Sequence, residues 1–311
     1  MNTKIKILSV NISEKKGTVK HPVEYIELNA LGVKGDAHSG TWHRQVSMLG
    51  TESIDKFTTA SNLKVKYGDF AENITTQGLE LYKTKPGDKF FGNGIELEVT
   101  QIGKSCHGDG CAIYRQVGNC VMPKEGIFVR VLKGGKLKDG DELEFIPKIY
   151  KIKVITLSDR ASKGEYEDLS GPEVSKLIAE FFDGLNWQHS VDKVIIPDDA
   201  DILKQHLTSA KKANYDIIIT TGGTGIGSRD ITPEVVRQML DKEIPGIMEM
   251  IRLKYGAEKP NALLSRGVAG LMGKTFVYTL PGSVKAVREY MTEIVKTQKH
   301  LFLMLMGIDS H

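Results

Sequence analysis

Cysteine is scarce in this chain. Only three of its 311 residues are cysteines, and an odd number without a secretion signal argues against a disulfide-stabilised secreted protein. Residues 1–20 lack the apolar core of a signal peptide, and no stretch approaches the length of a membrane span. These absences favour a protein of the reducing cytoplasm with no membrane partner.

An excess of charge of one sign is also missing. The formal net charge is +3, from 42 Lys and Arg against 39 Asp and Glu. The sequence shows no concentration of basic residues of the kind that forms a nucleic-acid-binding face. A nucleic-acid partner is therefore not expected. The apolar content of 40% is ordinary for a globular protein, and 311 residues are enough for two domains that each bury a core.

Glycine, in contrast, is abundant, and it is densest between residues 216 and 234. The β-branched run Ile217–Thr221 does not alternate in polarity, which predicts a strand buried on both faces. Pro233, with Thr232 as the cap, predicts the start of a helix further on. Four glycines that would let the backbone turn and present N–H groups to an anion lie between them: Gly222, Gly223, Gly225 and Gly227.

Two familiar phosphate-binding motifs fit this loop incompletely. A P-loop would need Lys and then Ser or Thr after Gly227, but the chain has Ser228 and Arg229. The dinucleotide-binding pattern would need its last glycine three positions after Gly225, and Gly227 comes too early. A glycine-rich connection without a ligand is the alternative interpretation.

The second half alternates strand and helix patterns. Strands are predicted at 152–157, 191–196, 217–221 and 276–280, and helices follow from Ser170, over 200–212, after Pro233 and after Ser283. This alternation predicts right-handed βαβ units and an α/β domain over 150–311 with a doubly wound, mostly parallel sheet.

Polar residues follow each of these strands, where open α/β sheets bind their ligands. Asp198 and Asp230 would meet there and hold Mg²⁺, while Arg229 and the loop N–H groups would neutralise phosphates. Positioning and charge stabilisation with a metal are what phosphoryl or nucleotidyl transfer requires. A solvated turn or a helix cap is the alternative for Asp198.

The second half resembles the MogA, MoaB and gephyrin G-domain family of molybdopterin adenylyltransferases. The resemblance rests on seven segments, in order: Leu157–Ser162, Ile196–Asp198, Thr220–Gly225, Arg229–Glu234, Pro245–Gly246, Leu264–Arg266 and Leu280–Gly282. It implies attack of the terminal phosphate of molybdopterin on the α-phosphate of ATP, with Mg²⁺ at Asp198 and Asp230, which match the two essential aspartates. It also implies a homo-oligomer, a trimer in this family.

From these matching segments and the strand ends, we expect one set of residues to bind molybdopterin and nucleotide. The set is Ser158, Asp159, Arg160, Thr221, Gly222, Gly223, Thr224, Gly225, Arg229, Ser265, Pro281, Gly282 and Ser283.

The first half, residues 1–147, predicts a mainly β fold. Strand-like runs at 5–12, 46–49, 95–102, 127–132 and 142–146 are separated by Gly, Asp and Asn turns, and only Thr51–Ala60 has a convincing helix pattern. Many short strands with such turns favour a closed barrel.

This half resembles a MOSC domain, the β-rich module associated with molybdenum-cofactor sulfurases. The resemblance rests on Lys34-Gly35-Asp36-x-His38, on the segment Gly68–Asn73, and on Cys106 after a strand. It implies that the sulfur of Cys106 ligates molybdenum or carries a transferable sulfur. A soft thiolate suits molybdenum, and neighbouring Lys104 and His107 would favour its ionised form.

Two other interpretations of the cysteines stay open. Cys106, His107, Cys111 and Cys120 could bind zinc, although their spacing matches no standard zinc module. Buried thiols without chemistry are the third interpretation, which suits Cys120 best.

We therefore expect an enzyme of molybdenum-cofactor assembly, with molybdopterin and ATP as substrates and other assembly proteins or apo-molybdoenzymes as partners. The main alternative is a non-catalytic carrier or scaffold for molybdopterin, which would not need a pair of metal-binding aspartates. A pyrophosphatase of the CinA type shares the general fold, but the segment Arg229–Glu234 argues against it. For the first half alone, the alternative is a molybdenum oxidoreductase acting on N-hydroxylated compounds.

Overall fold

The computed structural model describes residues 3–105 and 120–308. Contacts divide the chain into two compact units: the second is Ile149–Leu305, and the first combines the chain up to Lys148 with the chain from Met306 onward. The fold class expected for each half is confirmed, as the following paragraphs describe unit by unit. That 1–147 and 150–311 fold independently stays a prediction.

Seven strands of the first unit close into a barrel. Their order is β11-β7-β8-β9-β5-β6-β1, and pairing of β1 with β11 completes the circle. Neighbours are antiparallel except β5 and β6. The bounds are β1 Thr3–Ile12, β5 Val46–Gly50, β6 Ile74–Gln77, β7 Lys89–Gly92, β8 Ile95–Ile102, β9 Ile127–Lys133 and β11 Glu142–Ile146.

Side chains from alternate positions along each strand fill the interior of this barrel. In β8, Ile95, Leu97 and Val99 are fully buried, because successive residues of a strand point to opposite faces. Asn93 and Gly94 join β7 to β8 with φ angles of 51° and 75°, the left-handed pair that a two-residue hairpin turn requires.

Smaller elements surround the barrel. Strand β2 pairs antiparallel with the end of β1, and β10, β3 and β4 form a separate sheet. The bounds are β2 His21–Pro22, β3 Tyr25–Asn29, β4 Gly32–Val33, β10 Gly135–Lys138, α1 Thr51–Ser61, α3 Met122–Glu125 and the 3₁₀ helix η1 Leu81–Lys83.

The second unit is built on a six-stranded sheet of order β13-β12-β14-β17-β16-β15. The first four strands are parallel, whereas β16 and β15 run antiparallel to their neighbours. The bounds are β12 Tyr150–Leu157, β13 His189–Ile196, β14 Ile217–Thr221, β15 Lys242–Glu243, β16 Ala269–Met272 and β17 Thr275–Leu280.

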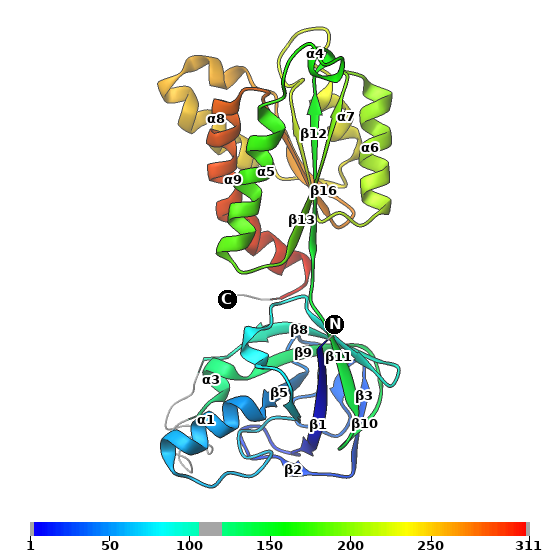
Figure 1. The fold of residues 1–311 in the computed structure, drawn as a ribbon, viewed down its shortest axis with the longest axis vertical. Coiled ribbons are helices and arrows are strands. Elements are labelled where there is room, and N and C mark those ends of the chain that lie inside the picture. Colours follow the sequence, from blue (N-terminus) through cyan, green and yellow to red (C-terminus); the bar gives the residue numbers. More distant parts are fainter. Residues whose placement is uncertain (1–2, 106–119, 309–311) are drawn as a thin grey trace. The chain divides into compact units, whose positions relative to one another are not determined.

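Helices cover both faces of this sheet (Figure 1). On the central strand β14, Ile217 and Ile219 pack with α5, α8 and α9, while Ile218 packs with α6 and α7. Covering of both faces explains why the β14 run is apolar throughout. The bounds are α4 Asp159–Ser162, α5 Ser170–Gly184, α6 Ala200–Lys212, α7 Thr232–Met239, α8 Pro245–Glu258, the 3₁₀ helix η3 Pro260–Leu264 and α9 Val284–Leu305.

The strand order fixes where a ligand can bind. The chain leaves β12 toward α5 on one face and leaves β14 toward α7 on the other. The carboxyl ends of these adjacent strands therefore border a crevice, the topological switch point of the sheet. None of the helices in the described part of the chain combines the length and the apolar composition of a membrane span.

Candidate functional site

A glycine turn begins directly at the end of β14. Gly222 and Gly223 have φ angles of 102° and 63°, a region that side chains with a Cβ rarely adopt. A Cβ on Gly222 would lie 2.3 Å from the carbonyl oxygen of Leu157, at the end of β12. A Cβ on Gly223 would lie 2.5 Å from Oγ1 of Thr232. Only glycine can bring the backbone this close to both neighbours.

Hydrogen bonds fix this turn to the surrounding elements. The N–H of Gly222 donates to the oxygen of Leu280 over 3.0 Å, and Oγ1 of Thr221 donates to the oxygen of Pro281 over 3.0 Å. The hydroxyl of Thr232 donates to the carbonyl of Gly222, also at 3.0 Å. The prediction that Thr232 caps α7 is wrong, because the helix begins at Thr232 itself and its side chain is committed to the glycine turn.

Two aspartates cross-link the ends of β12 and β13. The N–H of Asp159 donates to Oδ2 of Asp198 over 3.0 Å, and the N–H of Asp198 donates to Oδ1 of Asp159 over 3.1 Å. The two bonds hold both carboxylates at the crevice. A Cβ on Gly223 would lie 3.4 Å from Oδ1 of Asp198, so that carboxylate lies beside the glycine turn.

Arg229 closes the loop onto Asp159. Its Nε and Nη2 donate to the two carboxylate oxygens of Asp159 over 3.0 and 2.8 Å, a bidentate pair. This pair lowers the pKa of Asp159. The expected phosphate-neutralising cation is therefore present at the crevice, paired with a carboxylate.

Asp230 is held by its own loop. Its Oδ2 accepts the N–H of Gly227 over 2.8 Å, and Cβ atoms on Gly225 and Gly227 would come within 2.8 and 3.0 Å of the same oxygen. Burial raises the pKa of Asp198, and the negative charges of Asp159 and Asp230 raise it further. Three carboxylates therefore share the crevice with Arg229 as a counter-charge.

The carboxylates at this crevice can be compared with the ligands that Mg²⁺ requires. Among the described residues, no group of three or more His, Cys, Asp or Glu is placed to hold a metal by itself. Mg²⁺ usually takes one or two protein carboxylates and fills its shell with water and phosphate oxygens. Besides burial, repulsion from Asp159 and Asp230 raises the pKa of Asp198, and a divalent cation would relieve that repulsion. The residues therefore fit Mg²⁺ bound together with a phosphate ligand.

The remaining expected residues lie around this centre in different roles. Ser158 caps α4 by accepting the N–H of Ala161 over 3.1 Å, and Ser283 accepts the N–H of Ala286 at the start of α9 over 3.3 Å. Thr224 is buried, and a Cβ on Gly282 would lie 3.4 Å from Cα of Gly222.

Two expected residues make their contacts elsewhere. The guanidinium of Arg160 lies 5.5 Å from the ring centroid of Tyr166. Oγ of Ser265 accepts the N–H of Gly267 over 3.5 Å, and its carbonyl oxygen accepts Nη1 of Arg252 over 3.5 Å. These contacts do not join Arg160 or Ser265 to the carboxylate group.

Sequence reasoning assigned no role to Arg266, although it lies in the Leu264–Arg266 segment. In the structure, its guanidinium contacts Gly225, Asp230 and Glu234. The signal available was an arginine beside a matching serine, which does not indicate contact with a loop far away in the chain.

In the first unit, Cys106, His107 and Cys111 lie outside the described residues, so the structure does not test the proposed sulfur chemistry or zinc site. Cys120 is half-buried. The carboxylate of Asp36 is buried and pairs with Lys20, and it accepts N–H groups from Ser13 and Asn73 over 3.0 and 3.1 Å.

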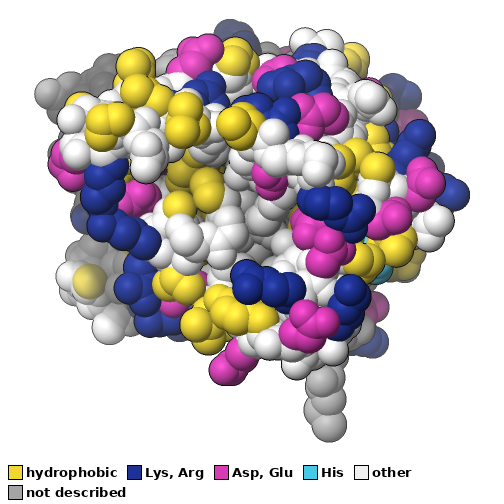
Figure 2. Space-filling view, turned by 90° about the horizontal axis from the view of Figure 1, so that it is seen from above, with side chains coloured by type: hydrophobic (Ala, Val, Ile, Leu, Met, Phe, Trp, Pro, Cys, Tyr) yellow, Lys and Arg dark blue, Asp and Glu magenta, His cyan; other side chains and the backbone are white. Residues whose placement is uncertain are grey.

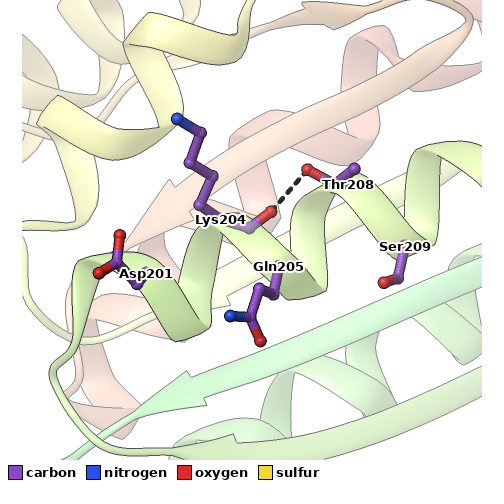
Figure 3. A pocket seen from close by; sticks show the side chains of 5 residues that line it. All are labelled: Asp201, Lys204, Gln205, Thr208 and Ser209. Carbon is purple, nitrogen blue, oxygen red and sulfur yellow. Dashed lines mark hydrogen bonds between the residues drawn. The ribbon is translucent and has the colours of Figure 1, made fainter.

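Figure 2 shows the carboxyl-end face of the second unit. A hollowed area of backbone and uncharged side chains lies at its centre, with basic and acidic side chains around it. A pocket of about 550 Å³ lies elsewhere, along α6. Its lining comes from one helix and includes none of the expected site residues (Figure 3): Asp201, Lys204, Gln205, Thr208 and Ser209.

Comparison with known proteins assigns a family to each half. Residues 153–300 match the family described as "Probable molybdopterin binding domain", and residues 35–144 match the MOSC domain. The molybdopterin adenylyltransferase of Helicobacter pylori J99 is 34% identical over 158 residues, 50% of this chain and 88% of the relative.

Two further matches cover the same half. The Drosophila melanogaster molybdenum cofactor synthesis protein cinnamon is 40% identical over 148 residues, 47% of this chain and 24% of the relative. A solved structure, the tungsten cofactor synthesizing protein MoaB of Pyrococcus furiosus, is 38% identical, with a TM-score of 0.45 over 51% of this chain and 98% of that one. The chain carries a MOSC domain and, through its second half, belongs to the MogA, MoaB and gephyrin family of molybdenum-cofactor biosynthesis proteins.

Proposed function

We propose that the second unit transfers an adenylyl group from ATP to the terminal phosphate of molybdopterin, with Mg²⁺ as cofactor. The observation that carries this proposal is the glycine turn at the switch point, bordered by Asp159, Asp198 and Asp230 and by Arg229. Adenylyl transfer to molybdopterin is supported by the names of relatives such as the Helicobacter pylori protein. That ATP is the nucleotide and Mg²⁺ the metal is inferred from the charges at the site.

Some residues of the site would bind the phosphates, and others would hold the metal ion that balances their charge. The glycine turn lets the backbone approach a phosphate closely, because no Cβ stands in the way. Arg229 would move its guanidinium from the carboxylate of Asp159 to a phosphate group, since each offers two oxygens that the planar guanidinium can bind together. Asp198 and Asp230 would hold Mg²⁺, which supplies positive charge to the phosphate oxygens when bound.

The test is incubation of the purified chain with molybdopterin, ATP and Mg²⁺, followed by detection of adenylylated molybdopterin and pyrophosphate. We expect both products in equal amounts, and neither when Mg²⁺ is replaced by a chelator. Binding of molybdopterin without turnover would reject the enzyme and favour the carrier.

For the first unit, we propose that Cys106 binds molybdenum or carries sulfur for the cofactor. Support comes from the family match over residues 35–144 and from the place of Cys106 after β8. Cys106→Ser should abolish retention of molybdenum by the protein, measured by elemental analysis, whereas Cys120→Ser should leave most of it. Equal loss from both changes would instead indicate a shared zinc site. Reduction of an N-hydroxylated compound by the loaded protein, with a chemical electron donor added to the assay, would support the oxidoreductase alternative.

We also propose that the chain works as a cytoplasmic homo-oligomer that exchanges cofactor with other assembly proteins or apo-molybdoenzymes. Support for self-association comes from large apolar side chains exposed on α8 and η3, among them Leu253 at 71% and Leu264 at 61%. Light scattering on the purified protein distinguishes a trimer from a monomer.

A further inference from the structure

One side chain from outside the loop that follows β14, the glycine loop Gly222–Asp230, binds two carbonyl groups of that loop. Nε of Arg266 donates to the carbonyl of Gly225 over 2.6 Å, and Nη2 donates to the carbonyl of Asp230, 36 residues earlier in the chain, over 2.8 Å. The backbone N–H of Arg266 also donates to the carbonyl of Thr224 over 3.2 Å. Three loop carbonyls are thus held by a single residue.

These contacts orient the loop. A peptide group that directs its carbonyl toward Arg266 directs its N–H to the opposite side, because the two bonds of a trans peptide are antiparallel. Arg266 therefore satisfies the acceptors of the loop and leaves donors available on the other side. Its hold on the carbonyl of Asp230 also limits where the Asp230 carboxylate can lie.

Arg266 is itself anchored. Its Nη1 donates to the carboxylate of Glu234, on the first turn of α7. With three nitrogen atoms committed in three directions, the planar guanidinium acts as a brace between Gly225, Asp230 and α7. An ammonium group of lysine is a single point with flexible reach and cannot reproduce this geometry.

We propose that Arg266 is a positioning residue of the transfer site: it holds the glycine loop so that the loop N–H groups and the Asp230 carboxylate face the phosphates. The inference rests on the proposed function for its kinetic consequence and on the loop geometry alone for its consequence on binding. Glu234 serves the same purpose through Arg266.

The experiment compares Arg266→Gln, Arg266→Lys and Glu234→Gln in the full chain, with Arg237→Gln as a matched control. Arg237 pairs with Glu243 at 3.3 Å on the outer part of α7, so its loss removes an Arg–Glu pair without touching the loop. Three quantities are measured: the dissociation constant of molybdopterin, the kcat with its KM for ATP, and the urea midpoint of unfolding.

We expect Arg266→Gln to lower kcat by about a hundredfold, the cost of misplacing a catalytic group by about 1 Å. Arg266→Lys should recover little of this loss, Glu234→Gln should lose less, and Arg237→Gln should behave as the wild type. Molybdopterin binding should weaken in Arg266→Gln while its urea midpoint stays near that of Arg237→Gln.

A double-mutant cycle separates positioning from a general structural role. If Arg266 acts through Asp230, adding Arg266→Gln to Asp230→Asn should lower kcat little further. Independent, multiplying losses, full rescue by lysine, or a loss that follows the urea midpoint would each overturn the proposal. If the wild type binds molybdopterin without turnover, the proposed reaction fails, and unchanged binding in Arg266→Gln would still reject the role of Arg266.

Discussion

At the scale of single residues, Asp230 is the most direct test of the metal site. Asp230→Asn keeps the oxygen that accepts the N–H of Gly227, so the loop should keep its shape. The amide lacks the charge that would hold Mg²⁺ against a triphosphate, and we expect kcat to fall by about a thousandfold, or ~4 kcal/mol of barrier. Molybdopterin affinity should change little, as measured by titration.

Asp198→Asn provides the companion measurement. It should behave like Asp230→Asn, and the double substitution should be scarcely worse if both side chains serve one metal. Wild-type kcat in either single variant would exclude the metal assignment.

A second residue-scale prediction concerns Glu72 in the first unit. Burial raises the pKa of its carboxyl from 4.5 to about 7, although hydrogen bonds from Gly68 and Thr75 oppose the shift. The folded state therefore binds a proton that the unfolded state has lost between these two pH values, so stability falls as pH rises through this window. By pH 8 the loss should reach about 3 kcal/mol.

Glu72→Gln should remove this pH dependence, because the amide is neutral throughout and its oxygen can accept the same two bonds. Trp42 and Trp187 are the two tryptophans, one in each unit, so urea unfolding in a Trp187→Phe background reports on the first unit. If the stability of the Glu72→Gln variant fell with rising pH as steeply as that of the protein that retains Glu72, the assignment would be contradicted.

At the scale of elements, the glycine turn should tolerate no Cβ. Gly222→Ala would set a methyl group 2.3 Å from the backbone oxygen of Leu157 at a φ of 102°, so β12 and β14 would have to separate. We expect a loss of ~1–3 kcal/mol or more in the second unit, together with loss of molybdopterin binding. Gly184→Ala, at the end of α5 with open space around it, should be neutral or stabilising. Urea unfolding followed through Trp187 in a Trp42→Phe background measures both.

Elements with a clean period could be predicted from the sequence. The bounds of α6, β8 and β11 agree with the expected ones, because each has a regular apolar pattern and a clear boundary. Helix α8 was not predicted as an element: Met248 and Ile251 face the core while Met250 and Leu253 are exposed, so its apolar residues occupy more than one face. The antiparallel strands β15 and β16 are short and carry little pattern of their own.

For the site as well, some residues could be predicted from the sequence and others could not. Asp198, Asp230 and the glycines could be named because they follow strands, and parallel strands bring their carboxyl ends together. The pairing of Asp159 with Arg229 and the reach of Arg266 to Gly225 depend on side-chain geometry between distant segments. No local pattern encodes that geometry.

At the scale of the whole molecule, we predict that the two units unfold as separate cooperative transitions. A chain of 149–305 contains the complete six-stranded sheet and should fold alone, as judged by a single urea transition and dispersed amide resonances. A chain of 1–147 should retain the barrel but be less stable than in the full protein, because it lacks the segment from Met306. Failure of both pieces to fold would show that each depends on the other.

The return of the chain to the first unit has a consequence for synthesis. Nη1 of Arg130 donates to the carbonyl oxygen of Met306 over 2.6 Å, and Ile308 is buried. A ribosome adds Met306 and Ile308 only after all of Ile149–Leu305 has been translated. The first unit cannot form their contacts before then. A chain that stalls or is truncated anywhere in its second half therefore also leaves the first unit without these contacts, although the residues up to Lys148 are complete.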